Sequence, residues 1–177
     1  MNKNKWKAIV WLIVLPFFFI PFGRGQNSKF DFTALDKENE EIEINPQDPW
    51  KREEVITPQE LVDALRKSSK KKDLVIFHMG FSFLYKASHI PGSDYVGSGK
   101  DKEGIANLEK KVSGLSKNQQ IVLYCGCCPW NQCPNIRPAF NALKQKEFAN
   151  LKVLFIPHDF AQDWIRKGYP IEKGFKN

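Results

Sequence analysis

The chain has 177 residues, 42% of them hydrophobic, which is enough for one ordinary domain with a packed core and a short additional segment. Its formal net charge is +7, but the first 25 residues hold four of the basic side chains and no acidic one, which leaves +3 for the rest. So small an excess argues against an extended nucleic-acid-binding surface, and we expect no nucleic acid among the partners.

The N-terminus has the pattern of an export signal. Three lysines within the first seven residues precede a continuous apolar run, Ala8 to Phe22. This run is shorter than the roughly 20 residues that a helix needs to cross a bilayer. A basic start followed by a short apolar run predicts a signal peptide, or an uncleaved signal anchor, over residues 1–25. We therefore expect an exported protein that is periplasmic, or that is anchored to the membrane only through this segment.

The folded part is expected to begin near residue 51. Residues 26–50 are polar and acidic in the middle, and they predict an extended lead-in. A domain is predicted over 51–177. Its first clear element is a helix of about ten residues, because Thr57 to Glu60 combines a capping threonine, a proline at the first helical position and a glutamate three residues after the cap.

The rest of the domain alternates strands and helices. Three short apolar runs predict buried strands at 74–77, 121–124 and 152–156. Apolar residues spaced by three and four predict helices at 103–115 and 136–146. This alternation indicates an α/β fold, in which a parallel sheet carries helices on both faces. Ligands of such sheets bind beyond the carboxyl ends of the strands.

All four cysteines lie in one loop between the second of these strands and the last of these helices. They are Cys125, Cys127, Cys128 and Cys133. Cys125 comes at the strand end, where we expect the N–H groups and dipole of the following helix to lower its pKa and make it a nucleophile. Gly126 permits an unusual backbone turn there. Asn135 is expected to cap the helix.

Several segments of this domain resemble the rhodanese-like family. They are "ITPQEL", "HIPGS", "IVLYC" and "DWIRKGYPIE", in the order and approximate spacing found in that family. The resemblance implies a rhodanese-like parallel sheet and a sulfurtransferase that needs no cofactor. In such an enzyme Cys125 takes sulfane sulfur from a small-molecule donor as a persulfide and passes it to a thiol acceptor. The "CGCCPW…CPN" loop would then mark an exported subgroup.

The cysteine cluster leaves a second class of function open. Thiolates in a C-x-C-C-x4-C string can bind copper or zinc, with His78 as a further ligand. Outside the cytoplasm the same thiols can instead form a disulfide, either in the C-x-x-C pair of Cys125 and Cys128 or between Cys133 and Cys127 or Cys128. The alternative is therefore a non-catalytic thiol module that binds a thiophilic metal or cycles a disulfide.

Other side chains near the expected site are candidates for its pocket. His78 ends a predicted strand, at a position where the family usually has a different motif, and His158 follows the last predicted strand. Trp130 lies within the cysteine loop and could form a wall of the pocket or bind a partner. Arg137 lies at the helix start and could attract an anionic sulfur donor. Cys127, Cys128 and Cys133 are candidates for resolving or modulating thiols.

Overall fold

The computed structural model describes residues 42, 44–67 and 73–175. The predicted signal segment 1–25 and most of the lead-in lie outside these residues. Within the described part, no helix combines the length and the apolar character that a membrane span requires.

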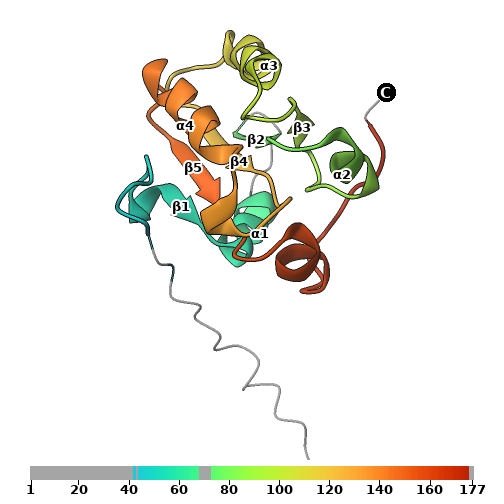
Figure 1. Cartoon of the computed structure of the whole chain (residues 1–177). Coiled ribbons are helices and arrows are strands. Elements are labelled where there is room, and N and C mark those ends of the chain that lie inside the picture. The colour runs from blue at the N-terminus through green and yellow to red at the C-terminus, as the bar shows by residue number, and fades with distance from the viewer. Residues whose placement is uncertain (1–41, 43, 68–72, 176–177) are drawn as a thin grey trace, which may run out of the picture. The chain divides into compact units, whose positions relative to one another are not determined.

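A parallel five-stranded sheet forms the centre of the described domain, with strand order β1-β5-β4-β2-β3 (Figure 1). The strands β2, β4 and β5 correspond to the three predicted strands. Strands β1 and β3 were not predicted, because two residues are too short to show a hydrophobic pattern. The bounds are Val55–Ile56 for β1, Leu74–His78 for β2, Asp94–Tyr95 for β3, Gln120–Tyr124 for β4 and Leu151–Leu154 for β5.

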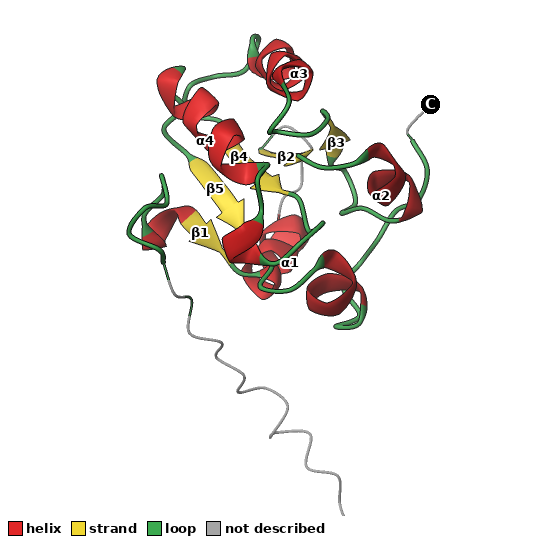
Figure 2. Ribbon diagram, in the orientation of Figure 1, coloured by secondary structure: helices red, strands yellow, loops and turns green. Residues whose placement is uncertain are grey.

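Helices follow most of the strands along the chain (Figure 2). Helices α1, α3 and α4 are the three that the sequence predicts. The α-helices are α1 at Pro58–Lys67, α2 at Ser82–Ala87, α3 at Lys102–Val112 and α4 at Ile136–Gln145. Short 3-10 turns lie at Arg52–Glu54 and Trp130–Gln132, and a π-helix lies at Ala161–Ile165.

The predicted start of α1 is confirmed in detail. The backbone N–H of Glu60 donates to the Thr57 hydroxyl over 3.2 Å, and the backbone N–H of Thr57 donates to the Glu60 carboxylate over 2.8 Å. Each side chain thus satisfies a backbone donor that the helix itself leaves without a partner.

Helices cover both faces of the sheet, which confirms the predicted α/β architecture. Alternate residues of a strand point to opposite faces, so Ile121 and Leu123 of β4 join one core cluster and Val122 and Tyr124 join the other. The first cluster contains apolar residues of α3 and α4, and the second contains residues of α1 and of the π-helix. Because both faces are buried, the strands read as continuous apolar runs rather than alternating patterns.

The packed domain extends slightly before residue 51. Trp50, at the end of the predicted lead-in, is only 3% exposed, and its ring lies 5.1 Å from the ring of Trp130. The side chain of Asp48 accepts a hydrogen bond from Arg137. The last residues of the lead-in therefore belong to the folded domain.

Candidate active site

The cysteine loop leaves the carboxyl edge of the sheet at its middle strand. β4 ends at Tyr124, which pairs with His78 at the end of β2. Cys125 follows directly, and the loop then runs to the start of α4 at Ile136. The sulfur of Cys125 is therefore held next to a rigid strand, at the edge where ligands of parallel sheets bind.

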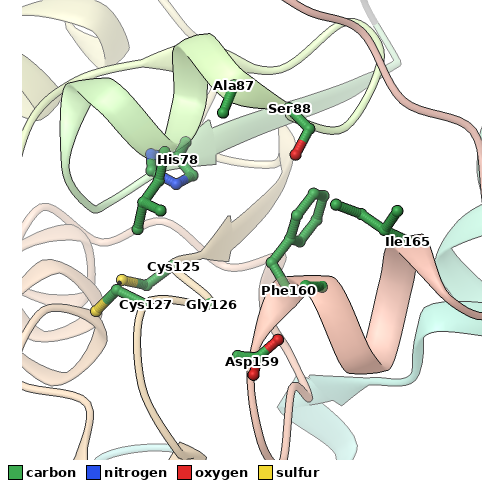
Figure 3. Close-up of a pocket in the computed structure, with 11 residues that line it drawn as sticks. His78, Ala87, Ser88, Cys125, Gly126, Cys127, Asp159, Phe160 and Ile165 are labelled. Atoms are coloured by element: carbon green, nitrogen blue, oxygen red, sulfur yellow. Dashed lines mark hydrogen bonds between the residues drawn. The ribbon is translucent and has the colours of Figure 1, made fainter.

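A pocket of about 350 Å³ opens beside this sulfur (Figure 3). Four of the candidate residues line it, namely His78, Cys125, Gly126 and Cys127. Of the residues that the structure describes, most of the others that line the pocket are apolar, Asp159 is the single carboxylate there, and no lysine or arginine lines it. The remaining lining residues are Leu84, Ala87, Ser88, Asp159, Phe160, Ala161 and Ile165.

Two glycines are required by the packing around the cysteine loop. Gly126 has a φ of +72°, and a Cβ there would lie 2.7 Å from the Cβ of Phe160. This turn brings the sulfurs of Cys125 and Cys127 within 3.1 Å of each other. At position 80 a Cβ would lie 2.8 Å from the His78 ring and 3.1 Å from the Cys125 sulfur, so Gly80 leaves space beside the thiol.

The four cysteines form one contiguous cluster of free thiols. The sulfur of Cys127 lies 3.1 Å from that of Cys125 and also 3.1 Å from that of Cys128. Cys133 approaches from the far end of the loop, and its sulfur lies within 4.8 Å of those of Cys125 and Cys127. Cys125 and Cys133 are buried, whereas Cys127 and Cys128 are partly exposed.

Asn135 is a site residue that the sequence prediction assigned to helix capping. Its side chain makes no cap hydrogen bond. Instead, its buried amide Nδ2 donates to the sulfur of Cys125 over 3.3 Å and to that of Cys127 over 3.7 Å. Its Oδ1 accepts from the Ser98 hydroxyl over 2.8 Å and from the Lys100 backbone N–H over 3.2 Å. Asn135 therefore ties the cysteines to the loop before α3.

The electrostatics of the cluster differ from the expected lowering of the Cys125 pKa. Hydrogen bonds with Cys127 and Cys133, together with burial, raise the pKa of the Cys125 thiol. The thiols of Cys125 and Cys133 hydrogen-bond to Cys127 and hold its pKa far below the ordinary value. The Cys125 thiol and the backbone N–H groups of Asn135 and Ile136 at the start of α4 lower the pKa of Cys133, but its hydrogen bond with Cys127 and burial raise the pKa above its ordinary value. Cys127 is therefore the thiol of the cluster whose ionised form is favoured, and the N–H groups at the start of α4 act on Cys133 instead of Cys125.

His78 is a buried, neutral neighbour of this cluster. Its side chain is 2% exposed, and its ring lies 4.9 Å from the ring of Tyr124. Burial lowers the pKa of His78 from 6.5 to about 4, although the negative charge on Cys127 opposes this shift. The imidazole is therefore uncharged at neutral pH.

Acidification should destabilise the protein through His78. Between pH 6.5 and pH 4 the unfolded chain binds a proton at this residue and the folded protein does not, so the free energy of unfolding should fall by about 2–3 kcal/mol. Urea denaturation at several pH values measures this loss, and His78→Phe should remove most of it. An equally steep pH dependence in the variant would assign the effect to other groups.

The candidate residues Trp130, Arg137 and His158 are not among the described residues that line the pocket. Trp130 packs between Trp50 and Phe155. Arg137 donates from Nε to Asp48 over 2.7 Å and from a terminal nitrogen to the backbone carbonyl of Cys133 over 3.0 Å. His158 pairs through Nδ1 with the carboxylate of Asp163 at 3.0 Å.

The sequence prediction named none of the seven remaining lining residues, and two of them, Asp159 and Phe160, directly follow the predicted His158. Both follow β5, the neighbour of β4 in the sheet. The backbone N–H of Phe160 donates to the carbonyl of Gly126 over 3.1 Å, which fixes this segment against the cysteine loop. Their place after a predicted strand was the available signal, since neighbouring parallel strands end at the same edge.

Comparison with known proteins identifies the family. The model of the rhodanese-like domain matches residues 52–154, which is more than half of the chain. The chain therefore belongs to the rhodanese-like domain family. No match was found among the curated proteins.

Solved structures with a similar fold come from several bacteria. The BH2092 protein of Bacillus halodurans is 20% identical, with a TM-score of 0.52 over 67% of this chain and 76% of that chain. The Alr3790 protein of Anabaena sp. is 17% identical, with a TM-score of 0.52 over 68% of this chain and 94% of that chain. At such identities these likenesses concern the fold alone, and they agree with the parallel α/β architecture described above.

Proposed function

We propose that this protein is an exported sulfurtransferase that carries sulfane sulfur as a persulfide on Cys125. The observation that carries the proposal is the position of this thiol. Cys125 follows the middle strand of a rhodanese-like sheet and lines a pocket, with a neighbouring sulfur and a buried amide in hydrogen-bond contact. The predicted export signal supports the location, and the four-cysteine loop would set this chain apart as a subgroup of the family.

The first half of the reaction would load the sulfur. The Cys125 thiol donates toward the sulfur of Cys127 over 3.1 Å, so Cys127 would take this proton while the Cys125 sulfur attacks the terminal sulfur of a persulfide donor. The proton moves against the raised pKa of Cys125 and the lowered pKa of Cys127, so it is transferred together with formation of the new S–S bond and not before it. A new S–S bond forms on Cys125 as the S–S bond of the donor breaks, and the donor leaves as a thiolate.

The second half would pass the sulfur on. A thiolate acceptor attacks the outer sulfur of the Cys125 persulfide and becomes a persulfide itself, while Cys125 leaves as a thiolate. The Asn135 amide, 3.3 Å from the Cys125 sulfur, stabilises the charge that this thiolate carries. No external oxidant or reductant is consumed, because the sulfane sulfur keeps its oxidation state throughout.

The lining of the pocket favours one class of donor. Within the described part of the chain, a dianion such as thiosulfate would meet the carboxylate of Asp159 and no cationic side chain in the pocket lining, and Arg137 is bound to Asp48 outside the pocket. An organic persulfide carries at most one negative charge, and its alkyl part would instead contact the apolar side chains of Leu84, Phe160 and Ile165. We therefore infer that a small organic persulfide is a better donor than thiosulfate.

Mass spectrometry of the loaded protein tests the proposal. Reduced full-length protein, incubated anaerobically with a small alkyl persulfide and then desalted, should gain about 32 Da, the mass of one sulfur atom in a persulfide. Fragmentation should place this sulfur on Cys125, and Cys128→Ser should gain it equally. Sulfur found only on Cys127, or no gain in mass, would contradict the assignment.

A further inference from the structure

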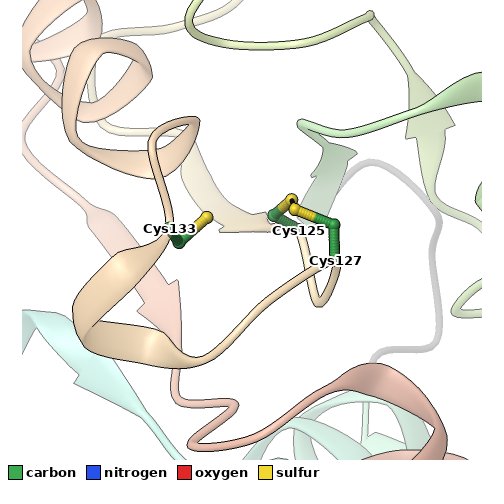
Figure 4. Close-up of side chains that lie close together, drawn as sticks. All are labelled: Cys125, Cys127 and Cys133. Carbon is green, nitrogen blue, oxygen red and sulfur yellow. Dashed lines mark hydrogen bonds between the residues drawn. The ribbon is translucent and has the colours of Figure 1, made fainter.

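Three of the four cysteines converge on one point. The sulfurs of Cys125, Cys127 and Cys133 all lie within 4.8 Å of one another, and Figure 4 shows the Cys133 sulfur pointing toward the other two from the opposite end of the loop. Cys125 is 3% exposed and Cys133 is 5% exposed, whereas Cys127, the third member of the group, is partly exposed. Cys128 contacts Cys127 but is not a member of this trio.

The spacing of the trio suits a metal ion bound by three thiolates. Sulfur ligands sit about 2.3 Å from a bound ion, which separates three sulfurs in a trigonal plane by roughly 4 Å. The three sulfurs already lie within 4.8 Å of one another, so only small side-chain movements would bring them to this spacing. Because the sulfurs already lie together in the folded loop, little ordering has to accompany binding.

The donor set favours copper(I) over zinc. Thiolate is a soft ligand that selects copper(I), whereas zinc in closed sites takes four ligands. In the part of the chain that the structure describes, no histidine or carboxylate joins the three sulfurs as a fourth member of the group. A three-sulfur site therefore matches the low coordination number of copper(I).

Asn135 provides the support that such a site needs. Three thiolates around a monovalent ion carry excess negative charge, and the Asn135 amide donates to the sulfurs of Cys125 and Cys127. Its oxygen is held by Ser98 and by the backbone of Lys100, so the amide is fixed in the orientation that points its N–H group at the sulfurs. Hydrogen bonds of this kind orient metal ligands and disperse their charge.

We propose that Cys125, Cys127 and Cys133 form a trigonal copper(I) site. The binding itself does not depend on sulfur transfer. Copper(I) and sulfane sulfur would compete for the same Cys125 sulfur, so that bound copper(I) would keep the thiol from accepting sulfur.

A competition titration with the full-length reduced protein tests the site. Under anaerobic conditions copper(I) is added together with a chromophoric copper(I) chelator. We expect the protein to retain one equivalent of copper(I) in competition with this chelator. Cys133→Ser and Cys127→Ser should each weaken the affinity at least about 100-fold, since even supporting residues outside the ligand set contribute 10- to 100-fold. The matched control Cys128→Ser should bind as the unaltered protein does.

X-ray absorption at the copper edge gives a second readout. It should show three sulfur neighbours at about 2.3 Å. Complete loss of copper(I) to the chelator would overturn the proposal, as would equal losses of affinity in Cys128→Ser and Cys133→Ser, or a preference for zinc with four sulfur neighbours. Circular dichroism of each variant shows whether it is folded. Because no step measures sulfur transfer, a negative result here and a failure of the proposed enzyme activity remain distinguishable.

Discussion

Replacing Cys125 with serine is expected to abolish transfer of sulfane sulfur from an alkyl persulfide to a thiol acceptor. Serine keeps the size of the side chain but cannot form a persulfide, and removal of a catalytic nucleophile costs at least about 1000-fold in rate. The measurement is the steady-state rate of persulfide formation on the acceptor, with the thermal unfolding of each variant recorded beside it. Only a folded Cys125→Ser protein that has lost turnover meets the expectation.

The neighbouring cysteines provide the controls for this experiment. Cys128 lies outside the pocket lining, so Cys128→Ser should keep most of the rate. Cys127→Ser removes the sulfur that receives the Cys125 proton and should slow the reaction without stopping it. If instead turnover survives in Cys125→Ser and disappears in Cys127→Ser, the persulfide belongs on Cys127, where the thiolate of the reduced cluster lies.

Asn135→Asp is expected to damage both stability and activity. Asn135 is fully buried, and the change replaces an amide that donates to two sulfurs by a carboxyl group beside the negative charge on Cys127. A buried charge without a partner destabilises a protein by about 4 kcal/mol, so the midpoint of urea unfolding should fall sharply at pH 8. Sulfur transfer by the folded fraction should also slow, because the Cys125 thiolate loses its amide donor.

Two further variants separate the effect of charge from that of the lost hydrogen bonds. Asn135→Ala removes the donor without adding a charge and should be less destabilised than Asn135→Asp. The exposed Asn150, whose amide donates to the backbone carbonyl of Asn118 over 2.7 Å, provides the matched control, and Asn150→Asp should unfold close to the unaltered protein. Similar losses at both positions would mean that Asn135 has no special relation to the thiols.

The elements that the sequence predicts correctly are those whose signals are local and long enough to show a pattern. The apolar runs that became β2, β4 and β5 are four or five residues long, and α1 begins at a capping box contained within four residues. In contrast, β1 and β3 have two residues each, and α2 has only six, among which Phe83 is 65% exposed. Such short elements form because they pair with or pack against segments that are distant in the chain. A local sequence pattern does not show these contacts.

The position of Cys125 was also predictable, since it depends only on the end of an apolar run and the start of a helical pattern. The residues around it were not. Arg137 reaches Asp48, 89 positions earlier, instead of a ligand pocket. Asn135 reaches Ser98, 37 positions earlier, instead of capping α4.

The sequence by itself thus determines the parallel sheet and the strand end at which the thiol lies, because apolar periodicity and capping act within a few residues, and the family is indicated by the resemblance of its motifs. The distribution of charge among the cysteines is decided only by tertiary structure. The turn at Gly126 places the sulfur of Cys127 3.1 Å from that of Cys125, and Cys133 returns to them from the other end of the loop. The pKa of a thiol depends on burial and on the hydrogen bonds at its sulfur, and both are set by how distant segments fold against each other.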